Sequence, residues 1–292
     1  RMGKENWRRR YRGLKEVRDG IDLHIHTKCS DGVLTPTQVV EKAYLKRLKT
    51  IAITDHDTVE GIEEALKATR YFGEIEVIAG AEFTTNYKPV AHILGLGIDI
   101  NNKHLISHFK QLERKKLFFL TMAIKFLKAE GINISMKKVQ EEMQTLTILN
   151  IKNFLLEQGL TIKGDARDNK LQEIIDEWVL ATPSPQECIE LIHVCGGKAV
   201  LAHPVHLHDD KSVLKNKIID FCNWGIDGIE IIHPDHTDAD RDIFKMWAKE
   251  MNLSCSGGSD FHGVNGRDDL ASGDSKDRSF VPYRYWEELR GK

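Results

Sequence analysis

Histidines and carboxylates stand at the ends of short apolar runs throughout this 292-residue sequence. The first example is the stretch DLHIHTKCSDG, in which His24 and His26 alternate with Leu23 and Ile25. Because a β-strand repeats every two residues, both imidazoles project from one face, together with Asp22. Neutral imidazole nitrogen and carboxylate oxygen are common ligands of divalent transition metals. The stretch therefore predicts either a solvated strand face or part of a metal site.

Six later apolar runs carry the same residue types at or near their ends. Seven of the 13 histidines occupy such positions, namely His24, His26, His56, His92, His203, His233 and His262. The carboxylates beside them are Asp31, Asp55, Asp57, Glu82, Asp235 and Asp260. A single histidine on a strand is usually a packing residue, but that explanation would have to hold seven times, so we predict a metal cluster. Within the motif TDHD, the sequence leaves open which of Asp55, His56 and Asp57 binds metal and which orients an imidazole.

The apolar runs are the predicted strands that must bring these side chains together. They cover residues 21–26, 50–54, 77–83, 90–95, 199–203, 228–233 and 253–256. Helix-like segments separate several of them, and Thr35 and Ser184, each followed by proline, mark two helix starts. Strands that alternate with helices are typical of an α/β fold with parallel strands. The carboxyl ends of parallel strands converge on one side, where the histidines and carboxylates would meet.

One region interrupts this alternation. Residues 102–182 contain successive helical patterns and no convincing strand, so we predict a helical insertion between the fourth and fifth strands. The main domain would then consist of residues 21–101 and 183–292, and residues 1–20 would form a basic N-terminal extension. The long predicted helix at residues 103–128 has one apolar face, which is typical of packing against other helices.

The composition argues against several classes of partner. With 42 basic and 44 acidic residues the net charge is −2, so the field of the whole chain does not favour duplex DNA or an anionic membrane. No apolar run reaches about 18 residues and no signal-peptide pattern is present, so we expect no membrane span. Five cysteines without a CxxC pair are typical of the reducing cytoplasm. The oligomeric state is not indicated.

Several motifs, in order along the chain, resemble those of the polymerase-and-histidinol-phosphatase (PHP) family of metal-dependent phosphoesterases. They are DLHIHTKCSDGVLTPTQVVEKA, IAITDHDTVEGIEEA, AGAEFTT, HILGLGID, GGKAVLAHP, GIEIIHPDH and GGSDFHG. The similarity is greatest to the branch that acts on nucleoside 3′,5′-bisphosphates, 5′-nucleotides or the 5′ ends of short RNA. This resemblance implies a distorted (β/α)7 TIM-like barrel formed by residues 21–101 and 183–292, with a trinuclear metal site. It also implies that the helical insertion at residues 102–182 caps the substrate.

The resemblance also implies which residues hold each ion. By position, the first ion would be held by His24, His26, Glu82 and Asp260. Glu82 would bridge to a second ion held also by His92 and His203, and the third ion would be held by Asp31, His56 and His262. The cofactors would be two or three divalent ions of zinc, manganese or iron. Asp55 would support the site without binding metal.

The expected reaction is metal-dependent hydrolysis of phosphoesters in small nucleotides or at the 5′ ends of short RNA. Clustered cations bind phosphate oxygens and lower the pKa of bound water, so a hydroxide that bridges two ions would attack phosphorus in line. The predicted catalytic residues are Glu82, Asp55 and His233. For His233 three roles stay open, which are binding the phosphate, protonating the leaving oxygen, or only capping the barrel rim.

The residues that contact the substrate are less clearly indicated. The nucleotide-acting branch is expected to carry an Arg-Pro-His element in the inserted helices, and the nearest stretch here is ILNIK at residues 148–152. The candidate substrate-binding residues are His233, Ser259, Lys152, Lys163 and Arg167. Two alternative functions stay open, namely a phosphatase of a small metabolite such as histidinol phosphate and a metal-stabilised interaction module without catalysis.

Overall fold

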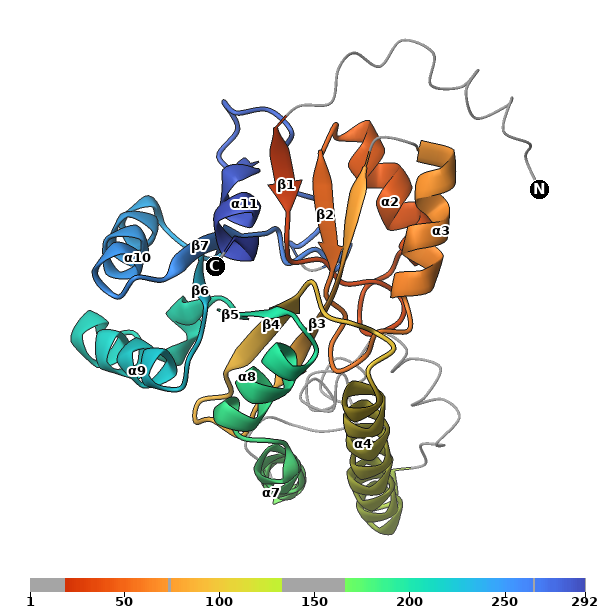
Figure 1. The fold of residues 1–292 in the computed structure, drawn as a ribbon. Helices are drawn as coiled ribbons and strands as arrows, with labels where there is room; N and C mark the ends of the chain where they lie inside the picture. The colour runs from red at the N-terminus through yellow and green to blue at the C-terminus, as the bar shows by residue number, and fades with distance from the viewer. Residues whose placement is uncertain (1–18, 73–74, 133–165, 265, 292) are drawn as a thin grey trace.

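The computed structural model describes residues 19–72, 75–132, 166–264 and 266–291. Its centre is a curved sheet of eight strands in the order β7-β6-β5-β4-β3-β2-β1-β8, surrounded by helices (Figure 1). The strands are β1 (Gly20–Asp22), β2 (Thr50–Ile53), β3 (Glu76–Thr84), β4 (His92–Leu96), β5 (Lys198–Leu201), β6 (Gly228–Ile232), β7 (Ser254–Gly257) and β8 (Val281–Pro282). The seven predicted strands are thus present, and β8 is an additional one.

The sheet is parallel in each half, but β4 breaks the pattern. Strands β1 to β3 pair in parallel and so do β5 to β7, whereas β4 runs antiparallel to both β3 and β5. The connection from β3 to β4 spans only residues 85–91. So short a connection joins antiparallel neighbours, because a parallel crossover needs about a dozen residues or more. The expected parallel pairing is therefore found on both sides of β4 but not at β4 itself.

Strand β1 is shorter than predicted, so His24 and His26 lie in an extended segment that follows it. The Ile25 N–H donates to Thr54 Oγ1 at 2.9 Å, and the His24 N–H donates to the Asp22 carboxylate at 3.3 Å. Side chains therefore replace part of the backbone ladder and end the regular strand early. Both histidines are fully buried, which excludes the solvated strand face that the alternation left open.

The sheet nearly closes into a barrel because the segment after β1 meets the segment after β7. Ile25 forms a parallel bridge with Phe261. Gly258 lies so close to the backbone of His24 that a Cβ atom there would be 2.5 Å from the His24 nitrogen. Only glycine fits this approach, and it places the two histidines after β1 beside the polar residues after β7.

Helices cover the outer face of the sheet. Their bounds are α2 (Pro36–Leu45), α3 (Ile62–Phe72), α4 (Lys103–Ala129), α7 (Ala166–Ala181), α8 (Pro185–Val194), the 3-10 helix η2 (Pro204–Leu207), α9 (Lys211–Asn223), α10 (Asp238–Glu250) and α11 (Arg284–Arg290). As predicted, Thr35 and Ser184 begin α2 and α8, each with a capping box and a proline in the first turn. Helix α11 buries Trp286 and Leu289 in the barrel core, and Leu289 lies beside Gly228 at the start of β6. Helix α11 therefore fills the amino end of the barrel. The polar residues lie at the opposite, carboxyl end, because they follow the strands.

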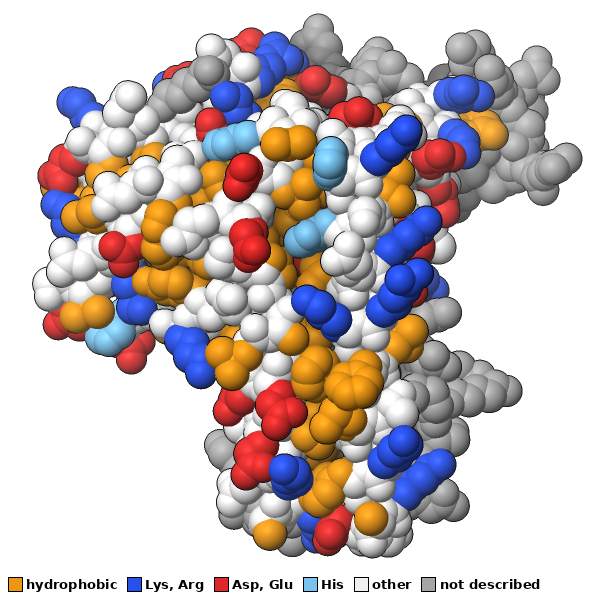
Figure 2. All heavy atoms as spheres, turned by 60° about the horizontal axis from the view of Figure 1, so that its bottom comes forward, with side chains coloured by type: hydrophobic (Ala, Val, Ile, Leu, Met, Phe, Trp, Pro, Cys, Tyr) orange, Lys and Arg blue, Asp and Glu red, His pale blue; other side chains and the backbone are white. Residues whose placement is uncertain are grey.

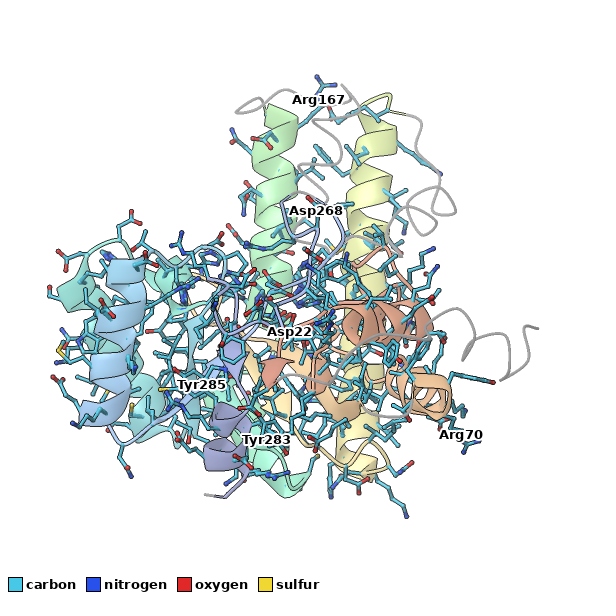
Figure 3. The ribbon with its side chains drawn as sticks, turned by 90° about the horizontal axis from the view of Figure 1, so that it is seen from above. Asp22, Arg70, Arg167, Asp268, Tyr283 and Tyr285 are labelled. Atoms are coloured by element: carbon cyan, nitrogen blue, oxygen red, sulfur yellow. The ribbon has the colours of Figure 1, made fainter. Side chains whose placement is uncertain are left out.

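The predicted helical insertion contains α4 and α7, which pack against each other and project from the barrel (Figure 3). Leu120 and Ile124 of α4 and Leu171 and Trp178 of α7 are buried in the core cluster that these helices share with the barrel. Residues 133–165 of the predicted insertion lie outside the described residues, and so do residues 1–18. None of the helices that the structure describes is long and apolar enough to cross a membrane.

Candidate metal centre

One carboxylate, Glu82 of β3, lies at the centre of the predicted cluster. Its Oε2 is 3.2 Å from His24 Nε2, 3.1 Å from His26 Nε2 and 3.3 Å from His56 Nδ1. His56 reaches Glu82 because an isolated bridge between the two residues continues the pairing of β2 with β3. Three imidazoles from two different strand ends therefore converge on one oxygen.

The other carboxylate oxygen of Glu82 faces a second pair of imidazoles. Oε1 is 3.1 Å from His92 Nδ1 and 3.0 Å from His203 Nε2. His92 is the first residue of β4, and because β4 is antiparallel, its first residue lies at the carboxyl end of its neighbours. A carboxylate that contacts five imidazoles through both oxygens has the arrangement of a ligand that bridges two cations.

Asp31, on the turn after β1, extends the cluster on one side. Its Oδ1 is 3.3 Å from His26 Nδ1, and its Oδ2 is 3.3 Å from His262 Nε2 and 3.7 Å from His56 Nε2. The ligand atoms of these four residues all lie within 4.8 Å of one another. They form a compact donor set of three imidazoles and one carboxylate.

Asp260, after β7, extends the cluster on another side. Its Oδ1 is 3.4 Å from His24 Nε2 and 3.2 Å from His26 Nε2. The ligand atoms of these residues and Glu82 also lie within 4.8 Å of one another. The structure thus brings together all the predicted metal ligands, which are His24, His26, Asp31, His56, Glu82, His92, His203, Asp260 and His262.

Several imidazole nitrogens of the cluster are buried without a hydrogen-bond partner. They are His24 Nε2, His26 Nε2, His56 Nδ1 and both ring nitrogens of His92. Carboxylate oxygens of Glu82 and Asp260 lie 3.1–3.4 Å from His24 Nε2, His26 Nε2, His56 Nδ1 and His92 Nδ1 but lack hydrogen-bond geometry. Ligand atoms bound to one ion at about 2.0–2.2 Å are themselves about 3.0–3.5 Å apart. The donor set therefore fits divalent cations, toward which these atoms would all point.

The electrostatics of the cluster also suit metal ligation. Burial lowers the pKa of His56 to about 3 and lowers that of His203, so both imidazoles are neutral near pH 7. Burial opposes ionisation of Glu82, but the surrounding imidazoles, including His24, hold the pKa of its carboxyl well below its usual range. Burial also opposes protonation of His24, yet the nearby carboxylates raise its pKa well above the usual value. A cation would displace that proton on binding.

Glu230 of β6 is a buried carboxylate that the sequence analysis missed. Its Oε1 is 3.2 Å from His24 Nδ1, and its Oε2 accepts the His203 backbone N–H at 2.7 Å. When Nδ1–H of an imidazole is donated to a carboxylate, Nε2 is left free to bind metal. Burial raises the pKa of Glu230, but the imidazoles around it, His24 first, lower it to about 2. The available signal was a charged residue in the middle of an apolar run.

Two other predicted site residues hold loops in place. Asp55 accepts hydrogen bonds from Thr27 N–H and Thr27 Oγ1, both at 2.7 Å, and from Ser30 Oγ at 2.6 Å. Ser259 donates its hydroxyl to the Asp22 carboxylate at 2.6 Å and its N–H to the same group at 2.9 Å. Within TDHD, Asp55 therefore supports the turn at Thr27 and Ser30. The Ser259 hydroxyl is already hydrogen-bonded to Asp22.

His233, after β6, is fully buried beside the cluster. Its Nδ1 accepts the Asp235 backbone N–H at 3.2 Å, so the proton of the neutral ring is on Nε2. That nitrogen lies 3.4 Å from Asp260 Oδ2 and has no hydrogen-bond partner. His233 therefore offers an N–H group at the edge of the predicted metal centre.

The structure does not bring Arg167 to the cluster. Arg167 lies in the first turn of α7, at the end that points away from the barrel in Figure 3. The other end of this helix adjoins the barrel, where the Asn86 N–H donates to the Pro183 carbonyl at 2.9 Å. A helix of 16 residues is about 24 Å long, so most of that length separates Arg167 from the barrel. Lys152 and Lys163 lie outside the described residues.

Figure 2 shows the face of the molecule at the carboxyl ends of the strands. Histidine and carboxylate side chains gather around a hollow in this face, and Lys and Arg side chains border it on one side. The side chains of His56, His92 and His262 are 13%, 15% and 19% exposed. The cluster is therefore reachable from solvent, as catalytic metal sites are, whereas structural sites are closed.

Comparison with known proteins agrees with this geometry. A family model described as the PHP domain matches residues 22–191. The chain is 34% identical over 247 residues to a 5′-3′ exoribonuclease from Haemophilus influenzae, which covers 82% of this chain and 89% of that protein. It is 29% identical over 286 residues to a 3′,5′-nucleoside bisphosphate phosphatase from Chromobacterium violaceum, which covers 93% of this chain and 97% of that protein.

A solved structure has the same fold. It is an amidohydrolase from Chromobacterium violaceum with bound sulfate and no metal, and it matches with a TM-score of 0.72 at 28% identity. The match covers 93% of this chain and 96% of that one. The barrel, the buried cluster of imidazoles and carboxylates, and the family match over more than half of the chain all point to one chemistry. The chain belongs to the PHP-domain family and is a metal-dependent hydrolase of phosphoester bonds.

Proposed function

We propose that the chain hydrolyses phosphoesters of small nucleotides, such as nucleoside 3′,5′-bisphosphates and 5′-mononucleotides, or of the 5′ ends of short RNA. The observation that carries this proposal is the contact of Glu82 with five imidazoles, several of whose buried nitrogens have no hydrogen-bond partner. The nucleotide class is supported by two relatives, one named for nucleoside bisphosphates and the other for RNA. The partner of the chain would be this small phosphorylated substrate.

The proposed centre holds two or three divalent ions of zinc, manganese or iron. We assign the ligands to three sets, which are His24, His26, Glu82 and Asp260, then Glu82, His92 and His203, and finally Asp31, His56 and His262. The first set and the third set, the latter together with His26, are supported by the mutual distances of their ligand atoms. Bound ions would neutralise phosphate charge and lower the pKa of a water molecule.

Two residues outside the ligand set have proposed roles in the reaction. When the ester is hydrolysed, a water oxygen bonds to phosphorus, the phosphorus bond to the leaving oxygen breaks, and the leaving oxygen takes up a proton. Water would supply this proton, because His233 accepts the Asp235 N–H at Nδ1 and cannot lose its remaining Nε2 proton without becoming an anion. His233 would instead donate its Nε2–H to a phosphate oxygen of the substrate, since no hydrogen bond occupies that nitrogen. Asp55 would act indirectly, because it fixes the turn at Thr27 and Ser30 that leads to Asp31.

A His233→Ala variant is expected to slow hydrolysis of nucleotides by about 10–100-fold, because a hydrogen bond to a charged group contributes about 1.5–3 kcal/mol. Hydrolysis of p-nitrophenyl phosphate should fall to the same degree, since a group that binds phosphate acts whatever the leaving group. The measurement is kcat/KM for both substrates. His193→Ala is the matched control, because His193 pairs with Asp227 on an exposed surface. A loss confined to nucleotides would contradict this role, because it would indicate a proton donor to the leaving oxygen.

The substrate class is tested by a phosphate-release screen of the full chain with Mn²⁺ and with Zn²⁺. The substrates are nucleoside 3′,5′-bisphosphates, 5′-mononucleotides, short 5′-phosphorylated RNA and histidinol phosphate. We expect selective hydrolysis of the nucleotide or RNA substrates. Selective hydrolysis of histidinol phosphate would show that the substrate is a small metabolite and not a nucleotide. Stoichiometric metal without hydrolysis of any phosphoester would indicate a metal-stabilised interaction module.

The proposal includes a domain organisation and a location. Residues 21–101 and 183–292 would form the barrel domain, and residues 102–182 would form an insertion that caps the substrate. The packing of α4 against α7 supports this division, because Lys115 Nζ donates to the Ala181 carbonyl at 2.8 Å. A cytoplasmic location is proposed from the cysteines, all five of which are free thiols.

A further inference from the structure

Arg267, in the loop after β7, contacts one of the predicted metal ligands. Its Nε is 3.0 Å from Asp260 Oδ2, and no other Lys or Arg in the described part of the chain forms an ion pair with a predicted ligand. Asp260 Oδ1 instead faces His24 Nε2 and His26 Nε2 at 3.4 and 3.2 Å. The two oxygens of Asp260 thus have different neighbours. Oδ1 faces the cluster, whereas Oδ2 pairs with Arg267 and lies 3.4 Å from His233 Nε2.

A second carboxylate, that of Asp235, holds Arg267 in this orientation. The two terminal nitrogens of Arg267 donate to the two oxygens of Asp235 at 3.0 and 2.6 Å. Asp235 also pairs with His206 Nε2 at 2.7 Å. Because the guanidinium is planar and its donors are fixed, a bidentate pair of this kind sets both its position and its rotation. The side chain of Arg267 is only 19% exposed.

The network connects three loops at the carboxyl end of the barrel. His206 lies in η2 after β5, Asp235 follows β6, and Asp260 and Arg267 follow β7. The Arg267 carbonyl also accepts the backbone N–H of His262 at 3.0 Å, so the same residue supports a second predicted ligand. Two of these loops carry predicted ligands, namely His203 after β5 and Asp260 and His262 after β7.

Asp260 needs outside support to face the cluster with a single oxygen. Its φ is 49°, in the left-handed region that non-glycine residues seldom adopt, so surrounding contacts must hold its backbone. Without a cation on Oδ2, the carboxylate could turn and present both oxygens to a bound metal ion. We infer that Arg267, itself held by Asp235, is a positioning residue that keeps Asp260 a one-oxygen ligand; the inference rests on the proposed metal-dependent function.

The test is a Mn²⁺ titration of metal-stripped full chain carrying Arg267→Gln, with free Mn²⁺ read by electron paramagnetic resonance. We expect the dissociation constant of one ion to rise by about 10–100-fold, the usual cost of removing a partner of a metal ligand. In the nucleotide assay kcat should fall while KM stays unchanged. Arg267→Lys should lie between, because one ammonium cannot serve both carboxylates with the same geometry. Arg290→Gln is the matched control, since Arg290 forms an exposed pair with Glu76.

Several outcomes would overturn the inference. Wild-type Mn²⁺ binding in Arg267→Gln would show that the arginine does not position the ligand, and a rise in KM alone would make it a substrate contact. If Arg267→Gln does not fold, Asp235→Asn removes the bidentate pair and should weaken Mn²⁺ binding in the same direction, so unchanged binding there would also refute the inference. The Mn²⁺ titration needs no substrate, so it tests the inference separately from the proposed function. If the wild-type protein binds Mn²⁺ but hydrolyses no nucleotide, the proposed function is refuted and this inference is not.

Discussion

A Glu82→Gln variant is expected to hydrolyse phosphoesters more than about 100-fold more slowly than the wild type. This loss exceeds the roughly 10–100-fold loss that removal of a partner of a metal ligand causes. Glu82 contacts three imidazoles through one oxygen and two through the other. The amide keeps the shape of the side chain but removes its negative charge and turns an NH₂ group toward imidazole nitrogens. Phosphate release at saturating Mn²⁺ and metal content per chain are the two measurements.

Glu63→Gln is the matched control for this variant. Glu63 is exposed on α3 and pairs with Lys67, so the same chemical change there should leave hydrolysis and metal content unaltered. The melting temperatures of both variants establish that they are folded. Full turnover by Glu82→Gln would contradict a catalytic metal centre built around this carboxylate.

A Glu230→Gln variant is expected to weaken metal binding by about 10–100-fold, as loss of a carboxylate that orients a ligating imidazole usually does. Glu230 contacts His24 Nδ1 with one oxygen and accepts the His203 N–H with the other. The amide has one oxygen and must place its NH₂ group against one of these two partners. If the NH₂ group faces His24, Nδ1 becomes the acceptor and Nε2 keeps the proton, so that nitrogen cannot bind metal.

The measurement for Glu230→Gln is the dissociation constant for Mn²⁺, together with kcat as a function of Mn²⁺ concentration. Saturating Mn²⁺ should restore part of the activity, because the residue acts through His24 and does not touch the substrate. Glu250→Gln, which alters a surface pair with Lys215 on α10, is the control. Mn²⁺ affinity equal to that of the wild type would show that Glu230 does not orient the ligand.

The ligand positions are predictable from the sequence because they depend on local rules. His24 and His26 share a face through the two-residue repeat, although the regular strand ends at Asp22. His203 lies two residues after β5, and the carboxyl ends of parallel strands meet on one side. His92 was also identified, since its antiparallel strand begins at that same side. Position relative to strand ends is therefore sufficient to find the residues that gather in the cluster.

The supporting residues are harder to predict because their roles arise from packing between distant segments. Glu230 lies inside a strand, and only the closed sheet shows that its carboxylate meets His24. Arg267 lies in an irregular loop, and its pairing with Asp260 and Asp235 depends on how the loops after β6 and β7 fold together. Asp55 and His56 are adjacent, so only the geometry of their turn assigns one to Thr27 and the other to the cluster.

The central claim, hydrolysis at a metal centre formed by the clustered imidazoles and carboxylates, is tested most directly by one measurement. The full chain is stripped of metal with a chelator and reloaded with increasing Mn²⁺, and phosphate release from a nucleoside 3′,5′-bisphosphate is followed together with the number of ions bound. We predict no release from the stripped protein and recovery in step with metal bound per chain. Undiminished release from the stripped protein would contradict the account.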